Sequence, residues 1–188
     1  QDFSPRHLAA ALEHSLRRLQ TDYVDLYQLH SPTLADLERH PDVIPLLRGW
    51  IQAGKIRTFG ISVRSPADGI AAIQRFGFPV IQVNFNMIDQ RAADDGLFAL
   101  ARKTGTGIIA RTPLVFGYLT GNLTGTERFV GTDHRANWPG DQRQRWAEAP
   151  RLFDFLAVPG RRSLVQACLR FCLDQEAIST VIPGMMSM

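Results

Sequence analysis

The apolar residues of this chain recur with two alternating periods. After Ser4 and Pro5, a pair typical of a helix start, leucines follow at positions 8, 12, 16 and 19 on one helical face. The next apolar run, residues 23–29, is apolar on both faces of an extended chain, which is typical of a parallel strand covered on both sides. Short apolar runs of this kind predict five strands, at residues 23–29, 56–61, 80–83, 107–110 and 180–182. Helices are expected from Pro5 and over 42–53, 65–75, 89–103, 141–157 and 163–175.

Alternating strands and helices indicate an α/β fold with a parallel sheet and right-handed crossovers. An open doubly wound sheet of five strands and an incomplete eight-stranded barrel both fit this pattern. No Gly-x-Gly-x-x-Gly follows a strand, and the chain is shorter than the roughly 250 residues of a typical barrel, so the pattern leaves both open. Residues 114–140 show little periodicity and predict one long loop, of the length used for binding loops or lids.

Polar side chains close four consecutive predicted strands. His30 follows the first, and a lone histidine there usually hydrogen-bonds a neighbouring loop. Because the carboxyl ends of parallel strands meet at one edge, we expect the polar side chains that close these four strands to line one crevice. Gln82 lies in an apolar strand and needs a hydrogen-bond partner, whereas Asn84 and Asn86 are explained equally well as solvated loop residues. In strand order, the polar side chains are His30; Ser62; Gln82 with Asn84 and Asn86; and Arg111.

Composition indicates an ordinary globular protein of 188 residues, with 45% hydrophobic and 21% charged residues and a net charge of +3. The basic residues are scattered between acids, so no nucleic-acid interface is expected. No apolar run reaches the ~20 residues of a membrane span, and the first residues do not resemble a signal peptide, so we expect a soluble cytoplasmic protein. Cys168 and Cys172 are expected to be reduced core residues, since two ligands do not complete a zinc site; no metal is expected.

Five segments together resemble the aldo-keto reductase family in their order and spacing, from about Asp2 to the last residue. They are SLRRLQTDYVDLYQLH, GKIRTFGISV, VIQVNFNMID, IIARTPLVFGYLTG and STVIPG. The resemblance implies a (β/α)8 TIM-type barrel, of which this chain would supply strands four to eight. It implies one aldo-keto reductase-like domain over residues 1–188, incomplete at both ends. The implied activity is reduction of an aldehyde or ketone to an alcohol by hydride transfer from NADPH, with a small-molecule carbonyl substrate.

The resemblance also assigns roles to residues. His30 matches the active-site histidine that orients the substrate carbonyl and assists proton delivery. Ser62 and Gln82 match the pair that hydrogen-bonds the nicotinamide carboxamide. Arg111 stands where many members stack an aromatic ring on the nicotinamide, and a planar guanidinium can stack similarly. The loop that wraps the pyrophosphate with backbone N–H groups is matched by Thr112, Pro113, Leu114, Gly117 and Gly121.

The chain departs from the family pattern in three places. Val63 replaces the usual Asn after Ser62, which removes one hydrogen bond to the carboxamide. Met186 stands where an Arg of the 2′-phosphate site sometimes lies, and NADP versus NAD preference therefore stays open. The proton-donating Tyr, with its Lys and Asp, comes from the first three strands in the family. None of Tyr23, Tyr27 and Tyr118 matches it, so residues 1–188 alone are expected to be inactive.

Two other functions remain open from the residues. One is a non-catalytic nucleotide-binding or assembly protein on the same barrel, because a fold does not dictate its chemistry. The other is a different α/β enzyme on an open five-stranded sheet. The substrate and the oligomeric state are not predicted.

Overall fold

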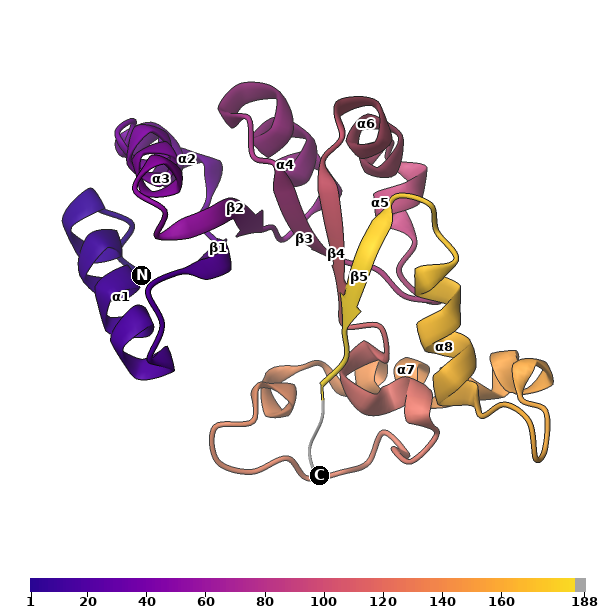
Figure 1. The fold of residues 1–188 in the computed structure, drawn as a ribbon. Coiled ribbons are helices and arrows are strands. Elements are labelled where there is room, and N and C mark those ends of the chain that lie inside the picture. The colour runs from indigo at the N-terminus through magenta and orange to yellow at the C-terminus, as the bar shows by residue number, and fades with distance from the viewer. Residues whose placement is uncertain (185–188) are drawn as a thin grey trace. The chain divides into compact units, whose positions relative to one another are not determined.

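The computed structural model describes residues 1–184, so Met186 lies outside the described residues. Strands and helices alternate along the chain as the hydrophobic pattern predicts (Figure 1). The strands are β1 (Val24–His30), β2 (Ile56–Ser62), β3 (Val80–Asn84), β4 (Gly107–Arg111) and β5 (Ile178–Ile182). The helices are α1 (Pro5–Leu19), α2 (Leu34–Arg39), α3 (Val43–Gln52), α4 (Pro66–Ala71), α5 (Arg91–Asp94), α6 (Leu97–Thr104), α7 (Gly140–Phe153) and α8 (Leu164–Leu173).

The strands form one sheet in the order β1-β2-β3-β4-β5, and β1, β2 and β3 pair in parallel. The predicted parallel α/β sheet is confirmed. Contacts divide the chain into two compact units: residues 1–83 with 91–109, and residues 84–90 with the chain from 110 onward. The single domain expected over residues 1–188 stays a prediction.

The first unit begins as its sequence predicts. The Ser4 hydroxyl accepts a hydrogen bond from the His7 N–H and Pro5 opens α1, which buries Leu8, Leu12 and Leu16. A short helix that the periodicity did not predict, α2, begins with a reciprocal cap between Thr33 and Asp36. Conversely, the helix predicted over 89–103 is two helices, because Gly96 adopts a left-handed φ of +87° between α5 and α6.

β1 corrects one expectation about burial. Residues 23–29 were expected to be buried on both faces, yet only Leu29 is buried; Tyr23 precedes the strand and is 40% exposed. The physical reason is its position: β1 is the first strand of the sheet, and within residues 1–184 no strand pairs with its other edge. The apolar composition of residues 23–29 therefore predicted more burial of β1 than the described residues provide.

The second unit contains the segment expected to be one long loop. That expectation is wrong in part, because two 3-10 turns, η2 (Val115–Thr120) and η3 (His134–Asn137), lie within it. Phe116 packs against Trp138 with ring centroids 4.6 Å apart, and Trp138 packs edge-on to Trp146 at 5.0 Å. This aromatic cluster orders a segment with no apolar periodicity.

Cys168 and Cys172 are free and buried on α8, as predicted. Burial raises the pKa of the Cys168 thiol to about 11 and that of Cys172 to about 12. Among the described residues, no three His, Cys, Asp or Glu side chains are grouped to hold a metal ion. No helix between residues 1 and 184 has the length and apolarity needed to cross a membrane.

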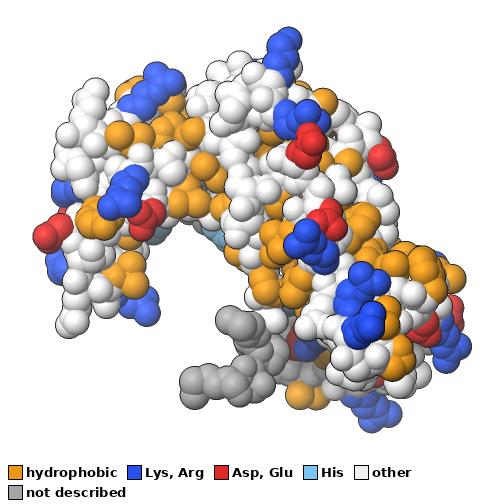
Figure 2. Space-filling view, turned by 45° about the vertical axis from the view of Figure 1, so that its right-hand side comes forward, with side chains coloured by type: hydrophobic (Ala, Val, Ile, Leu, Met, Phe, Trp, Pro, Cys, Tyr) orange, Lys and Arg blue, Asp and Glu red, His pale blue; other side chains and the backbone are white. Residues whose placement is uncertain are grey.

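Basic side chains lie at separate places on the face shown in Figure 2, several of them beside acidic ones. Lys55 pairs with Glu13, and Arg57 lies 2.8 Å from Asp25. Such exposed pairs stabilise a fold little, and the basic side chains visible in Figure 2 do not merge into one continuous basic surface on that face.

Candidate active and cofactor site

Three of the predicted site residues lie side by side on adjacent strands of the first unit. His30 of β1 is the register partner of Ser62 of β2, and Ser62 is the partner of Gln82 of β3. Partners in a parallel ladder face the same side of the sheet. The residues preceding them, Leu29 and Ile61 among them, are buried on the opposite face.

That opposite face carries the helices. Tyr27 of β1 contacts the ring of Trp50 on α3 edge-on, with centroids 5.4 Å apart. Since side chains alternate along a strand, Gln28 and His30 point away from this helix layer. Gln82 shares their face, so its side chain also points away from the helices.

Gln28, Gln82 and Ser62 form a hydrogen-bonded series that we call the amide chain. Gln28 Nε2 donates to Gln82 Oε1 at 3.2 Å, and Gln82 Nε2 donates to Ser62 Oγ at 3.3 Å. Ser62 is only 2% exposed. Gln82 thus has the partner that its position in an apolar strand required, although Gln28 itself was not predicted as a site residue. The signal was present in the sequence, because Gln28 shares a strand face with His30.

Gly60 lies between the two glutamines. It is the register partner of Gln28 on β2. A Cβ atom at Gly60 would lie 3.0 Å from both Cβ and the carbonyl oxygen of Val80, tighter than most Cβ contacts, so that Val80 would have to shift. The glycine permits β2 and β3 to approach, and it leaves only backbone on the face over which Gln28 reaches Gln82.

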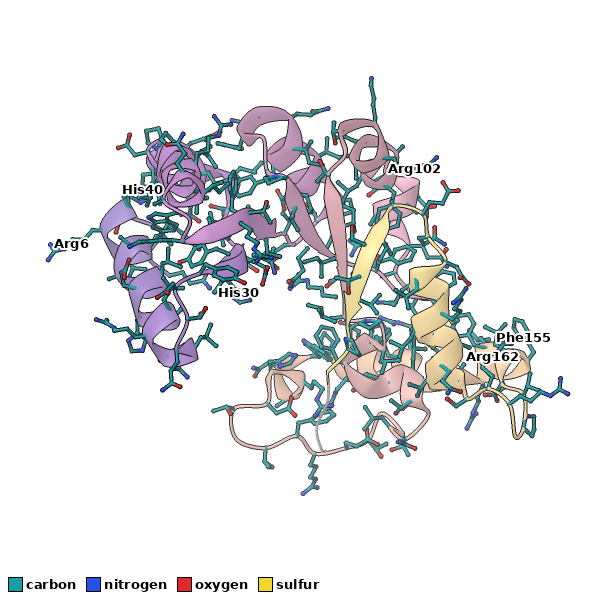
Figure 3. The ribbon with its side chains drawn as sticks, in the orientation of Figure 1. Arg6, His30, His40, Arg102, Phe155 and Arg162 are labelled. Carbon is teal, nitrogen blue, oxygen red and sulfur yellow. The ribbon has the colours of Figure 1, made fainter. Side chains whose placement is uncertain are left out.

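His30 is exposed at the end of β1, where Figure 3 labels it. The side-chain amide nitrogen of Gln1 lies 3.3 Å from His30 Nδ1. An amide nitrogen only donates, so His30 Nδ1 is the acceptor of this pair. The adjacent Ser31 has a φ of +56°, and this left-handed residue turns the chain sharply away from the strand end.

Val63 stands where the family pattern has Asn, and its side chain is 2% exposed. Its backbone N–H donates to the Gln82 carbonyl at 2.9 Å. The backbone here therefore continues the ladder between β2 and β3, while the side chain offers no hydrogen bond.

The other predicted cofactor residues belong to the second unit. Arg111 closes β4 and is half-buried. Thr112 follows with a φ of +56°, and Phe116 and Gly117 also have positive φ values, of 55° and 99°. Left-handed residues other than glycine are strained, and such strain collects at binding loops.

Two glycines of this loop donate hydrogen bonds inside the loop. The Gly117 N–H donates to the Leu114 carbonyl at 3.0 Å, and the Gly121 N–H donates to the Tyr118 carbonyl at 3.1 Å. These two N–H groups are used within the loop, and the role of Gly117 and Gly121 at a diphosphate stays a prediction.

Arg135 holds the loop and was not predicted. Its Nη1 donates to the Phe116 carbonyl at 3.1 Å, its guanidinium binds Asp133, and it lies 4.2 Å from the Phe129 ring centroid. Hydrogen bonds from Arg135 lower the pKa of the Asp133 carboxyl to about 2. No periodicity in the sequence pointed to this arginine.

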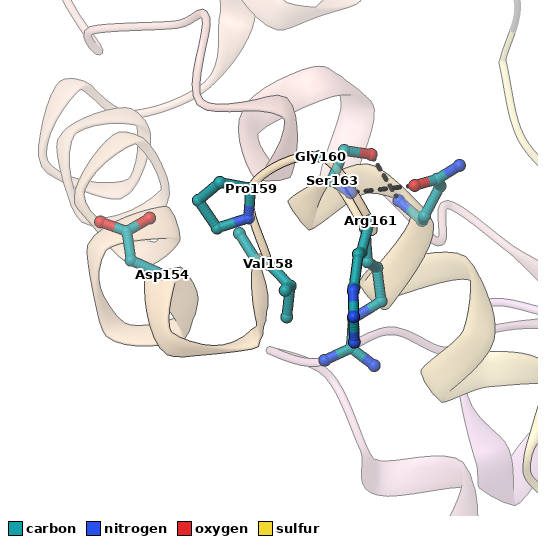
Figure 4. A pocket seen from close by; sticks show the side chains of 9 residues that line it. Asp154, Val158, Pro159, Gly160, Arg161 and Ser163 are labelled. Atoms are coloured by element: carbon teal, nitrogen blue, oxygen red, sulfur yellow. Dashed lines mark hydrogen bonds between the residues drawn. The ribbon is translucent and has the colours of Figure 1, made fainter.

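A shallow hollow of about 670 Å³ surrounds the turn before α8 (Figure 4). Its lining includes Asp154, Val158, Arg161 and Ser163, and the dashed lines mark the cap between Ser163 and Gln166. None of the predicted site residues lines it. It is a surface feature separate from the assigned positions.

A model of the aldo/keto reductase family matches residues 1–188. The chain belongs to that family. It is 32% identical over 180 residues to aldo-keto reductase YhdN of Bacillus subtilis, and the match covers 92% of this chain and 53% of that relative. It is 30% identical over 189 residues to the NADH-specific methylglyoxal reductase of Escherichia coli, covering 98% of the chain and 57% of that enzyme.

Solved structures agree with this membership. The holo form of aldo-keto reductase AKR11C1 from Bacillus halodurans matches with a TM-score of 0.71 and 28% identity, over 100% of this chain and 59% of that one. Glycerol dehydrogenase AKR11B4 from Gluconobacter oxydans matches with a TM-score of 0.77 and 28% identity, and the match covers 96% of this chain and 55% of that one. This aldo/keto reductase chain spans about half the length of the curated relatives it matches. Its sheet fits part of a (β/α)8 barrel, and the open-sheet alternative is excluded.

The residues of the first unit fit a nicotinamide carboxamide. That group carries one acceptor oxygen and an NH2 donor. The buried Gln28 Oε1 has no hydrogen-bond partner among residues 1–184, and the Ser62 hydrogen is not used by its bond from Gln82. One acceptor and one donor on the same face of two neighbouring strands are the complement that a carboxamide requires.

Proposed function

We propose that this chain carries part of the active site of an NADPH-dependent oxidoreductase that reduces an aldehyde or ketone to an alcohol. The observation that supports the proposal is the row His30, Ser62, Gln82 on adjacent strands, facing away from the helices. Family membership agrees with it, and relatives named for methylglyoxal and L-glyceraldehyde 3-phosphate reduction act on small carbonyl compounds.

Each residue has a defined task in this proposal. His30 presents Nε2–H, a donor that can orient a carbonyl oxygen. Ser62 and Gln82 hold the carboxamide, which fixes the face of the ring. A bound nicotinamide cofactor supplies the hydride. Arg111 stacks on a planar group, and the segment from Thr112 to Gly121, with Pro113 and Leu114, contacts the diphosphate.

The compartment is part of the same proposal. Two free buried thiols suit a reducing environment, and we place the protein in the cytoplasm on that basis. A metal is not assigned a role.

A second function competes with reduction. Val63 removes one carboxamide partner, which favours a protein that binds a nucleotide weakly without turning over a carbonyl. Titration separates the two when NADPH and NADH are added to the full-length protein and turnover is followed with a panel of aldehydes.

The variants sharpen the comparison. We expect Ser62→Ala to raise the dissociation constant of NADPH about 2- to 10-fold, and His30→Ala to abolish turnover while leaving that constant unchanged. Nucleotide binding without turnover in the wild type supports the second function. Absence of binding to either nucleotide rejects both.

A further inference from the structure

We propose that Gln28, besides offering its Oε1 to the cofactor, sets through Gln82 which way the Ser62 hydroxyl hydrogen points. Neither the strand pattern nor the family resemblance gives Gln28 a role. The inference rests on the proposed function, because the group that Ser62 would meet is the carboxamide of the cofactor.

The geometry of the amide chain carries the first step. A primary amide has a donor end and an acceptor end, and Gln82 uses both: Oε1 toward Gln28 and Nε2 toward Ser62. Whatever holds the oxygen of Gln82 therefore also directs its nitrogen. Gln28 Nε2 is the group that holds it.

The second step concerns Ser62. Because Ser62 Oγ accepts from Gln82, its hydrogen is left to donate outward, toward an acceptor such as a carbonyl oxygen. If both amides were turned over, Gln82 Oε1 would face Ser62 and the hydroxyl would donate to it. Ser62 could then only accept from a ligand, and a carboxamide oxygen would find no donor there.

The third step is that the structure is built to let Gln28 reach. Gln28 and Gln82 lie on β1 and β3, with β2 between them, and the residue of β2 in register with Gln28 is Gly60. A side chain at Gly60 would stand on the face that the two amides cross. Within the described part of the chain the buried Gln28 Oε1 has no hydrogen-bond partner, which carries a free-energy penalty that a ligand N–H group would remove.

Gln28→Glu tests the inference, because a carboxylate at position 28 only accepts. Gln82 would then turn its nitrogen toward residue 28 and its oxygen toward Ser62, which consumes the hydroxyl hydrogen. Gln28→Met is the second variant, since it removes both hydrogen-bonding ends at similar length. Gln74→Glu, an exposed position beyond α4, adds the same charge as a control.

The readout is binding to the full-length protein, not turnover. Dissociation constants are measured for NADPH and for its thionicotinamide analogue, in which sulfur, a weak acceptor, replaces the carboxamide oxygen. We expect the wild type and Gln74→Glu to prefer NADPH about 2- to 10-fold, the net range of one hydrogen bond. Gln28→Glu and Ser62→Ala should show a ratio near one, and Gln28→Met an intermediate ratio.

The outcomes separate this inference from the proposed function. If Ser62→Ala loses the preference while Gln28→Glu and Gln28→Met both keep it, Gln28 does not position Ser62 and the inference is overturned, yet the cofactor site stands. Should Gln28→Glu not fold, Gln28→Met decides alone, and a wild-type ratio in that variant rejects the inference. If the wild type binds neither nucleotide, the proposed function fails first.

Discussion

Asn86 and Thr112 join two segments of the second unit through a buried hydrogen bond. Asn86 Nδ2 donates to the Thr112 carbonyl at 3.1 Å, and Asn86 is 4% exposed. The same side chain accepts from the N–H groups of Ile88 and Asp89 at 2.9 and 2.8 Å. Asn86 is therefore a structural residue, and its interpretation as a solvated loop residue is wrong.

The first prediction follows from these three bonds. Asn86→Ala leaves a carbonyl and two N–H groups without a side-chain partner, and we expect it to lower the free energy of unfolding by about 2–4 kcal/mol. Chemical denaturation of the full-length protein measures the change. Asn122→Ala, at an exposed position in the same unit, should alter stability by less than about 0.5 kcal/mol. Equal stability of the two variants would contradict the structural role of Asn86.

Arg111 gives a prediction about cofactor stacking. Arg111→Ala should weaken NADPH binding about 2- to 30-fold without unfolding the protein, because a stacked cation contributes about 0.5–2 kcal/mol. Arg111→Trp restores a planar group at this position and should bind NADPH nearly as well as the wild type. Fluorescence titration gives both constants, and a wild-type constant in Arg111→Ala would reject the stacking role.

Glu127 makes the second unit sensitive to acid. Its carboxylate accepts from the Thr124 N–H, the Thr124 hydroxyl and the Gly125 N–H, and these bonds lower its pKa from 4.5 to about 2, with the Thr124 N–H as the main cause. A depressed folded pKa gives stability that is complete above pH 4.5 and is lost as the pH falls from 4.5 toward 2.

Denaturation at a series of pH values between 7 and 3 tests this dependence. Wild type should lose more stability over that range than Glu127→Gln, by on the order of 1 kcal/mol for a partly exposed group. Glu148→Gln, an exposed carboxylate on α7, should follow the wild type. Parallel curves for wild type and Glu127→Gln would show that these bonds do not couple to folding.

A polypeptide of residues 1–188 alone should not reduce carbonyls at the rate of an aldo-keto reductase. Among its tyrosines, Tyr27 packs on the helix side against Trp50, and burial raises its pKa. Tyr118 is fully buried in the second unit, and burial raises its pKa as well. Tyr23 lies at the opposite end of β1 from His30. None is a proton donor beside the carbonyl.

NADPH oxidation by this polypeptide with several aldehydes gives the answer. Reductase-like turnover would mean that a residue other than a tyrosine donates the proton. Turnover by His30→Ala would then show whether the histidine is that donor.

The sequence predicted elements well where a cap or a period marked them. Ser4-Pro5 placed the start of α1, and Gln82, an amide in an apolar strand, was expected to have a partner. Features set by contacts between distant residues were missed. Arg135 binds a carbonyl 19 residues away, and Gln28 meets Gln82 across 54 residues. Alternation places Gln28 on the same strand face as His30, but the partner of Gln28 and that of Arg135 depend on strand register and loop closure, which no local pattern records.

Burial was also predicted unevenly, because alternation shows which side chains share a face but not what covers that face. The exposure of β1 depends on its place in the sheet, and the burial of Asn86 depends on a loop that returns from β4.

Gly60 has a consequence for how this sequence can vary. Any side chain there would press on the backbone of Val80, and it would also stand where Gln28 passes over β2. Position 60 is therefore constrained twice, once by folding and once by the site. A library carrying every amino acid at Gly60 and selected for folding should retain glycine almost alone. Selection for nucleotide binding should enrich glycine further, because a side chain at position 60 would also obstruct Gln28.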